Sequence, residues 1–192
     1  MATPPPDSPP SGIERLSPDE PSPSDAGPLP DAPDLLGVIT AANHAALPYV
    51  IIGGFAVIAN QYVRATEDVD LLIKGDHALD PVLLGFLDRI GAHRHEQPIT
   101  LRVLASADTL RVQSRFGLVD MLREGAPPLD FATVAREAIE LTFHEQPTRV
   151  ASLSSLVAFK RLANRPRDQL DLLELERIHG TLPMQPIPGL DD

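Results

Sequence analysis

Asp68 and Asp70 have the spacing of a site for hard metal ions, because residues i and i+2 of a β-strand project from the same face. Carboxylate oxygens are preferred ligands of Mg²⁺, which proteins commonly bind together with the phosphate oxygens of a substrate. A third carboxylate is expected from Asp120, which stands in an apolar, strand-like run at residues 118–122. A charge buried among apolar neighbours needs a compensating partner, and a metal ion would be one. The three aspartates therefore predict a magnesium site.

A pair of glycines, Gly53 and Gly54, stands between these aspartates and a short apolar run at residues 49–52. This order predicts a buried strand, a glycine turn and the start of a helix. Backbone N–H groups at a helix start favour anions, and glycine lets a phosphate approach the backbone closely. Each motif alone has an ordinary explanation, because turns and solvated Asp-x-Asp strands are common. The two together, followed by Asp120, indicate a metal-dependent phosphate site.

Apolar periodicity predicts the elements that position these residues. Asp34 is expected to cap the first helix, and Gly91 to end the third. The predicted helices span residues 35–46, 55–62, 81–90, 131–138, 152–163 and 166–178. The predicted strands span residues 49–52, 68–74, 101–105, 110–114, 118–122 and 139–143. This order predicts an α/β (α+β) fold in which helices flank a small mixed sheet and the last two helices form a pair.

Composition divides the chain into a domain and two tails. Residues 1–33 are rich in proline and acidic side chains and predict a disordered tail, residues 34–180 predict one domain, and residues 181–192 form a Pro-rich C-terminal tail. The formal net charge of −11 argues against a general nucleic-acid coat protein, and the lack of cysteine excludes disulfides. The longest apolar stretch is too short to span a bilayer and no targeting signal is visible, so we expect a cytoplasmic protein without a membrane partner.

In these motifs the chain resembles the nucleotidyltransferase (polymerase-β-like) superfamily, and more narrowly the AbiEii and MenT toxin nucleotidyltransferases. That family has a Gly-Ser or Gly-Gly turn, a helix, an Arg-x-Ser/Thr-x-Asp-x-Asp segment and a later strand aspartate. The matching residues are Gly53, Gly54, Arg64, Thr66, Asp68, Asp70 and Asp120. A distal lysine, followed shortly by an arginine and an aspartate in a C-terminal helical pair, corresponds to Lys160 and to the segment that contains Asp168. The resemblance extends over residues 48–178.

The resemblance implies the nucleotidyltransferase fold and the transfer of a nucleoside monophosphate from an NTP to an acceptor hydroxyl, with pyrophosphate leaving. Asp68 and Asp70 would hold Mg²⁺, and Asp120 would be a further ligand or the base for the acceptor hydroxyl. Lys160 would offset the charge of the triphosphate, and Asp168 would orient the site. The nucleotide-binding residues would be Gly53, Gly54, Arg64, Thr66 and Lys160. The family also implies an RNA acceptor such as the 3′ end of tRNA, and a toxin–antitoxin setting with a cognate antitoxin as partner.

Two other functions remain open at the level of the sequence. One is nucleotidylation of a small molecule or a protein, which the acidic net charge favours. The other is a catalytically degenerate module that binds nucleotide as a partner protein. The family's usual serine is Gly54 here, and Gly54 offers a phosphate only its N–H group.

Several basic residues and two histidines have ordinary explanations beside functional ones. Lys160 could be a lysine at the domain edge that extends its amine to solvent, and Arg64 could pair with Glu67 instead of holding nucleotide. His93 and His95 lack a third ligand and are expected to be surface residues. Further arginines could hold an RNA backbone if they share a face, and are otherwise solvated: Arg89, Arg94, Arg102, Arg111, Arg115, Arg123, Arg161, Arg165 and Arg167.

Overall fold

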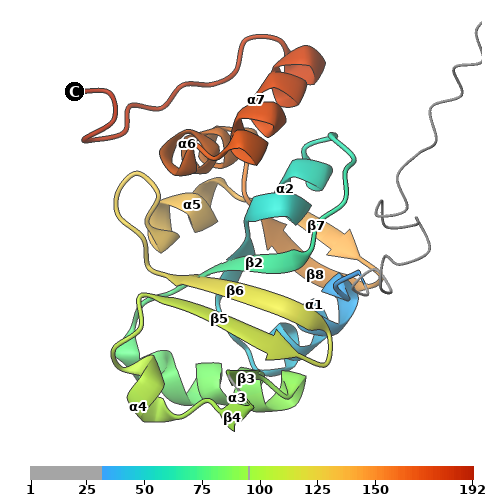
Figure 1. Cartoon of the computed structure of the whole chain (residues 1–192), viewed down its shortest axis with the longest axis vertical. Helices are drawn as coiled ribbons and strands as arrows, with labels where there is room; N and C mark the ends of the chain where they lie inside the picture. Colours follow the sequence, from blue (N-terminus) through green and yellow to red (C-terminus); the bar gives the residue numbers. More distant parts are fainter. Residues whose placement is uncertain (1–31, 95) are drawn as a thin grey trace, which may run out of the picture. The chain divides into compact units, whose positions relative to one another are not determined.

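The computed structural model describes residues 32–94 and 96–192 (Figure 1). The predicted disordered tail lies outside the described residues except for its last two positions, and His95 also lies outside them.

One mixed sheet of eight strands forms the frame of the domain, in the order β4-β3-β5-β6-β2-β1-β8-β7. The neighbouring pairs β2–β6 and β1–β8 are parallel, and the other pairs are antiparallel. The strands are β1 (Tyr49–Ile51), β2 (Asp68–Ile73), β3 (His93–Arg94), β4 (Gln97–Pro98), β5 (Thr109–Ser114), β6 (Gly117–Arg123), β7 (Ile139–Phe143) and β8 (Gln146–Val150).

Helices lie on both sides of this sheet (Figure 1). Helices α1 and α3 pack against each other on one side, while α2 and the C-terminal pair of α6 and α7 lie on the other. The helical elements are α1 (Leu35–His44), α2 (Gly53–Ala59), the 3-10 turn η2 (His77–Leu79), α3 (Asp80–Ile90), α4 (Leu101–Leu104), α5 (Phe131–Glu137), α6 (Leu153–Ala163) and α7 (Pro166–His179).

The predicted caps explain where two of these helices begin and end. The Asp34 carboxylate accepts a hydrogen bond of 2.9 Å from the backbone N–H of Gly37, which starts α1. Gly91 takes the left-handed conformation (φ 63°) that ends α3. Between its ends, α3 buries Leu83, Phe86, Leu87 and Ile90, which recur at helical spacing and face the core.

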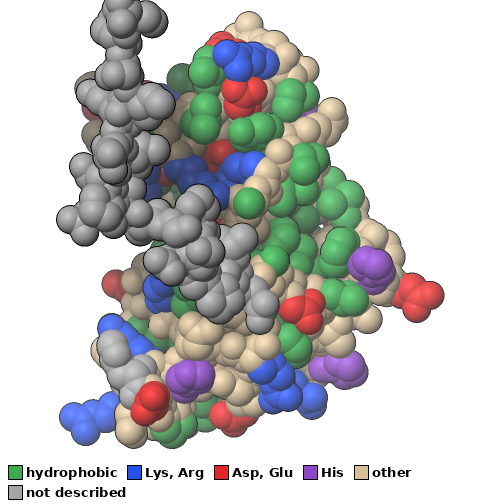
Figure 2. Space-filling view, turned by 45° about the vertical axis from the view of Figure 1, so that its right-hand side comes forward, with side chains coloured by type: hydrophobic (Ala, Val, Ile, Leu, Met, Phe, Trp, Pro, Cys, Tyr) green, Lys and Arg blue, Asp and Glu red, His purple; other side chains and the backbone are tan. Residues whose placement is uncertain are grey.

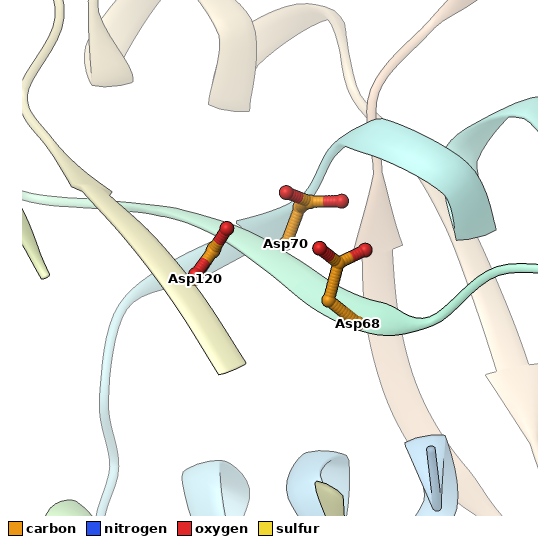
Figure 3. Close-up of side chains that lie close together, drawn as sticks. All are labelled: Asp68, Asp70 and Asp120. Atoms are coloured by element: carbon orange, nitrogen blue, oxygen red, sulfur yellow. The ribbon is translucent and has the colours of Figure 1, made fainter. Parts of the chain in front are cut away.

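Strand β2 separates the core from the carboxylates by alternation. Val69 and Leu71 are fully buried, whereas Asp68 and Asp70 point to the opposite face, which is the side away from α1 (Figure 3). Val69 and Leu71 therefore contribute to the hydrophobic core, while the two carboxylates lie on the opposite face of β2.

The prediction of a strand at residues 101–105 is wrong. Residues 101–104 form the short helix α4, in which Leu104 is buried. Strand β5 already pairs with β3 on one edge and β6 on the other, so no edge of β5 remains for a further strand. Helix α2 also begins at Gly53, two residues before the predicted start at Phe55.

Strands β3, β4 and β8 were not predicted from the sequence. Strands β3 and β4 have two residues each, too few for a recognisable alternation. Strand β8 contains Pro147, which is disfavoured within a sheet, and it joins β7 in a hairpin whose turn uses the positive-φ residues His144 and Glu145.

The C-terminal segment after α7 lies against the domain. Ile187 is buried, and the Arg161 guanidinium of α6 donates a hydrogen bond of 2.9 Å to the carbonyl of Gln185. None of the described helices has both the length and the apolar character needed to cross a membrane.

The surface mixes charged and apolar side chains. On the face drawn in Figure 2, basic and acidic side chains adjoin one another, and hydrophobic side chains gather beside them. The large apolar residues that stay exposed include Val63, Leu162, Leu170, Leu173 and Met184.

Candidate metal and nucleotide site

Three carboxylates converge on one face of the sheet (Figure 3). Asp68 and Asp70 project from β2, and Asp120 projects from the neighbouring parallel strand β6, where it is in register with Asp70. Parallel strands in register present paired residues on the same face. One oxygen of each carboxylate lies within 4.8 Å of the other two, which is the arrangement of a metal site with three ligands.

The surroundings of these carboxylates disfavour three negative charges. Burial, and then the charges of Asp68 and Asp120, raise the pKa of Asp70 to about 6. Burial also raises the pKa of Asp120, with the Arg111 guanidinium acting in the opposite direction. Among the described residues, Asp120 Oδ1 is one of two buried side-chain atoms without a hydrogen-bond partner. A divalent cation would supply the partner and the charge that these atoms lack, so the residues fit a metal ion.

Gly53 is required by the position of Asp70. It has a φ of +59°, and a Cβ atom at this position would lie 1.9 Å from Asp70 Oδ2. The next backbone N–H, that of Gly54, donates a long hydrogen bond of 3.4 Å to the same oxygen. The start of α2 and the carboxylate of β2 are therefore in direct contact.

Gly54 is required by the position of Thr66. A Cβ atom on Gly54 would lie 2.2 Å from Thr66 Oγ1 and 2.8 Å from Thr66 Cβ. The Thr66 hydroxyl also donates a hydrogen bond of 3.3 Å to the carbonyl of Asp68. A serine at position 54 would collide with Thr66, so the glycine in the second position of the turn has a steric reason within this chain.

A buried network of ion pairs connects the C-terminal helices with the segment before β2. Lys160 Nζ lies 2.7 Å from Asp168 Oδ1 and 2.9 Å from Asp171 Oδ2. Arg64 donates from Nε (2.7 Å) and Nη2 (2.9 Å) to the two carboxylate oxygens of Asp171, whose side chain is fully buried. Lys160 is itself buried, so the interpretation of an edge lysine reaching into solvent does not describe it.

Asp171 belongs to this network but was not predicted from the sequence. Asp168 and Asp171 are three residues apart on α7, and both face Lys160 on α6. That spacing was the available signal. The suggested pairing of Arg64 with Glu67 is not found, because Arg64 pairs with Asp171 and Glu67 lies 3.7 Å from Arg167.

A cavity of about 300 Å³ brings the predicted site residues together. It is lined by all of those named as catalytic, nucleotide-binding or metal-binding: Gly53, Gly54, Arg64, Thr66, Asp68, Asp70, Asp120, Lys160 and Asp168. Arg111, Arg165 and Arg167 line the same cavity, although the sequence indicated them only as possible RNA contacts. His93 lies on β3, where its Nδ1 is 3.3 Å from the carbonyl of Gly91, and it does not line this cavity.

Comparison with known proteins finds similarity in structure. No protein-family model matches the sequence, and no curated protein matches it. The crystal structure of ANT(2″)-Ia in complex with adenylyl-2″-tobramycin aligns over 75% of this chain and 84% of that one, with 18% identity and a TM-score of 0.50. The lincomycin-bound lincosamide antibiotic adenylyltransferase LnuA aligns over 76% of this chain and 96% of its own, with 16% identity and a TM-score of 0.51.

A third similar structure is an antigenic nucleotidyltransferase-like protein from Paracoccidioides brasiliensis, with 18% identity, a TM-score of 0.51 and coverage of 77% of each chain. The described domain therefore has the nucleotidyltransferase fold, as the sequence predicted.

Proposed function

We propose that this protein is a metal-dependent nucleotidyltransferase, which transfers a nucleoside monophosphate from an NTP to an acceptor hydroxyl. The observation that carries the proposal is the convergence of Asp68, Asp70 and Asp120, beside the glycine turn, in one cavity of about 300 Å³. The nucleotidyltransferase fold of the similar structures supports this assignment.

The three carboxylates would hold Mg²⁺. Bound there, Mg²⁺ would neutralise phosphate charge and lower the pKa of an acceptor hydroxyl. In the reaction, the acceptor oxygen forms a bond to the α-phosphorus of the NTP as the bond to the pyrophosphate oxygen breaks. The hydroxyl proton passes to a base, and Asp120, whose pKa burial raises, is the carboxylate that we assign to this role or to ligation on the acceptor side.

The cations of the buried network would bind the phosphates of the nucleotide. A lysine amine has three N–H donors, and two carboxylates contact Lys160, so one donor remains for a phosphate oxygen. Arg64 has five N–H donors and uses three, on Asp171 and on the carbonyl of Ala65. Asp168 and Asp171 act through these two cations by holding them in place.

The glycine turn and Thr66 would provide the remaining phosphate contacts. Gly53, Gly54 and Thr66 line the cavity together, so the backbone N–H groups of the turn and the Thr66 hydroxyl are candidates for these contacts. We therefore assign Gly53, Gly54 and Thr66 to nucleotide binding.

The acceptor that we propose is the 3′ hydroxyl of an RNA such as tRNA, in a toxin–antitoxin setting with an antitoxin as partner. This part of the proposal is supported by the motif resemblance and by the arginines in the cavity. A small-molecule acceptor is the second candidate, because two of the similar structures contain adenylyl-2″-tobramycin or lincomycin.

The test incubates the purified full chain with Mg²⁺, each α-labelled NTP in turn, and either total tRNA or an antibiotic acceptor. Label should enter the acceptor with the natural chain and with Asp88→Ala, which removes an exposed acid from α3. Label should not enter with the double substitution Asp68→Ala and Asp70→Ala. Transfer that survives this double substitution would refute the proposed site, and Mg²⁺-dependent NTP binding without transfer to any acceptor would favour a degenerate nucleotide-binding module.

A further inference from the structure

Arg111 lies across the three-carboxylate cluster. It projects from β5, where it is in register with Asp120 of β6. Its Nη1 lies 3.1 Å from Asp120 Oδ2, and its Nη2 lies 3.6 Å from Asp68 Oδ2. The Arg111 side chain is 60% exposed, so it contacts the cluster from the solvent side.

A divalent cation and Arg111 would compete for the same carboxylates. Asp68 and Asp120 are both members of the cluster that fits a metal ion. An ion bound there compensates the negative charge that attracts the guanidinium. Exposed ion pairs contribute little to stability, so Arg111 can leave the carboxylates without disturbing the core.

The charge of the cavity indicates which kind of group would bind Arg111 after it leaves the carboxylates. Five cationic side chains line the cavity beside four carboxylates: Arg64, Arg111, Lys160, Arg165 and Arg167. Asp171 already engages Arg64 and Lys160 from the buried side. A bound divalent ion would therefore leave the cavity with an excess of positive charge, which favours the phosphate groups of its ligands.

Two of these cationic side chains, Arg111 and Arg165, act on Asp120. Arg111 contacts this carboxylate directly, and the charge of Arg165 acts on it from the segment before α7. In the proposed reaction, Asp120 is the carboxylate nearest the acceptor. Arginine is well suited to this position, because its planar guanidinium binds phosphate through paired hydrogen bonds.

We propose that Arg111 exchanges its carboxylate partners for a phosphate of the acceptor, so that the acceptor carries a phosphate next to its reacting hydroxyl. This inference rests on the proposed function. Two sources have that chemistry, a free nucleotide and the end of an RNA chain. A polycationic acceptor such as tobramycin does not.

The first experiment measures Mn²⁺ binding by electron paramagnetic resonance, without any reaction. Arg111→Ala should raise the affinity for Mn²⁺ by about three- to tenfold, because a competing cation has been removed. Arg102→Ala, which removes an exposed arginine of α4 outside the cavity, should leave it unchanged. Equal Mn²⁺ affinities of the natural chain and Arg111→Ala would overturn the exchange.

The second experiment measures binding of a short single-stranded RNA with a free 3′ hydroxyl, in the presence of Mn²⁺ and a non-hydrolysable NTP. Arg111→Ala should weaken binding by about tenfold, and so should a neutral methylphosphonate at the last linkage of the RNA. Combining the two changes should add little, because both remove the same contact. A 5′-mononucleotide that matches the RNA in affinity would identify a free nucleotide as the source, and a much weaker one would identify an RNA end.

Unchanged RNA affinity in Arg111→Ala, or tobramycin binding that exceeds RNA binding, would refute the inference. Binding of the NTP analogue separates this failure from failure of the proposed function. If the natural chain and Arg111→Ala both bind Mn²⁺ and the analogue, the proposed function stands while the acceptor assignment falls. If the natural chain binds neither, the proposed function itself is wrong. Circular dichroism melts of each variant should match that of the natural chain, because Arg111 is exposed.

Discussion

At the scale of single residues, two glycines let side chains of the candidate site lie directly against the backbone of α2. Gly53 makes room for the Asp70 carboxylate, and Gly54 makes room for the Thr66 side chain. The sequence predicted both glycines as a phosphate turn, but it did not predict these two contacts. The Gly54 contact depends on how the segment before β2 folds back over α2, and the Gly53 contact depends on how β2 passes the start of α2. No local pattern encodes either arrangement.

Replacing Gly53 by alanine should displace Asp70 from the cluster. The new Cβ would overlap Asp70 Oδ2, and the positive φ of Gly53 adds strain of about 1 kcal/mol. We expect Mn²⁺ affinity to fall by about tenfold or more, measured by titration. Gly85→Ala is the matched control, because no atom lies within 4 Å of its new Cβ in α3. The steric explanation fails if the Gly53 variant binds Mn²⁺ as well as the control does.

Gly54 and Thr66 should behave as a coupled pair. Gly54→Ser alone should destabilise the chain, because the serine Cβ meets Thr66. Adding Thr66→Gly should recover part of that loss, with a coupling free energy of about 0.5–3 kcal/mol in urea unfolding. Additive effects of the two substitutions would contradict the contact.

The pKa of Asp70 predicts how metal binding and stability depend on pH. The pKa is raised from 3.8 to about 6, so the folded, metal-free chain holds a proton that the unfolded chain releases. This proton stabilises the fold fully below the unfolded pKa, and the contribution is lost as pH rises through about 6.

Asp70→Asn should therefore stabilise the metal-free chain near neutral pH by about 1–3 kcal/mol and change little at acid pH. Mn²⁺ affinity of the natural chain should fall below about pH 6, where protons compete for the carboxylate. Urea unfolding and Mn²⁺ titration across this range measure the two effects. If the difference in stability between metal-free Asp70→Asn and the metal-free natural chain does not vary with pH, the raised pKa is ruled out.

At the scale of elements, local sequence patterns predicted helix caps and strand alternation. They did not predict features that depend on which strands pair in the sheet. Asp34, Gly91 and the alternation in β2 each predicted a feature that the structure has. Residues 101–105 have an apolar pattern that suits a strand, but β5 has partners on both edges and the segment is helical. Asp171 was not predicted as a site residue, because its partners, Arg64 and Lys160, lie on other parts of the chain.

The buried network should be the strongest link between α7 and the rest of the site. Asp171→Asn would leave Arg64 and Lys160 short of a buried negative charge, and we expect a loss of about 3–5 kcal/mol in unfolding free energy. Glu174→Gln on the same helix alters only the partly exposed pair with Arg177 and should change stability by about 0.5 kcal/mol or less. Equal losses of unfolding free energy in the two variants, measured with urea, would show that the buried network contributes no more than the partly exposed pair.

At the scale of the whole molecule, the candidate site joins parts that are far apart in the chain. Its residues come from α2, β2, β5, β6, α6 and α7, or from the segments between them, so ligands should stabilise the domain as a unit. The overall order of helices and strands was predictable because most elements have clear periodicity. Residue spacing predicted the aspartates and the glycine turn of the cavity, and the motif resemblance added its other predicted residues. The remaining arginines of the cavity have no local signature.

Mg²⁺ together with a non-hydrolysable NTP should raise the melting temperature of the full chain. At ligand concentrations about 100-fold above the dissociation constant, the gain in stability should be about 2.7 kcal/mol. The double substitution Asp68→Ala and Asp70→Ala should abolish the shift, whereas Asp88→Ala should retain it. A shift of equal size in the double variant would place ligand binding elsewhere.

The register of β2 and β6 makes the site intolerant of changes in strand length. Asp70 and Asp120 meet because the two strands are aligned residue for residue. One residue inserted just after Gly117 would bring Val119 opposite Asp70 and would move Asp120 to the place of Met121, which is buried in the core. Two inserted residues would restore the facing but would shift the carboxylate along the strand. Relatives with this chemistry should therefore vary in the loops around β6 while keeping the count of residues within it.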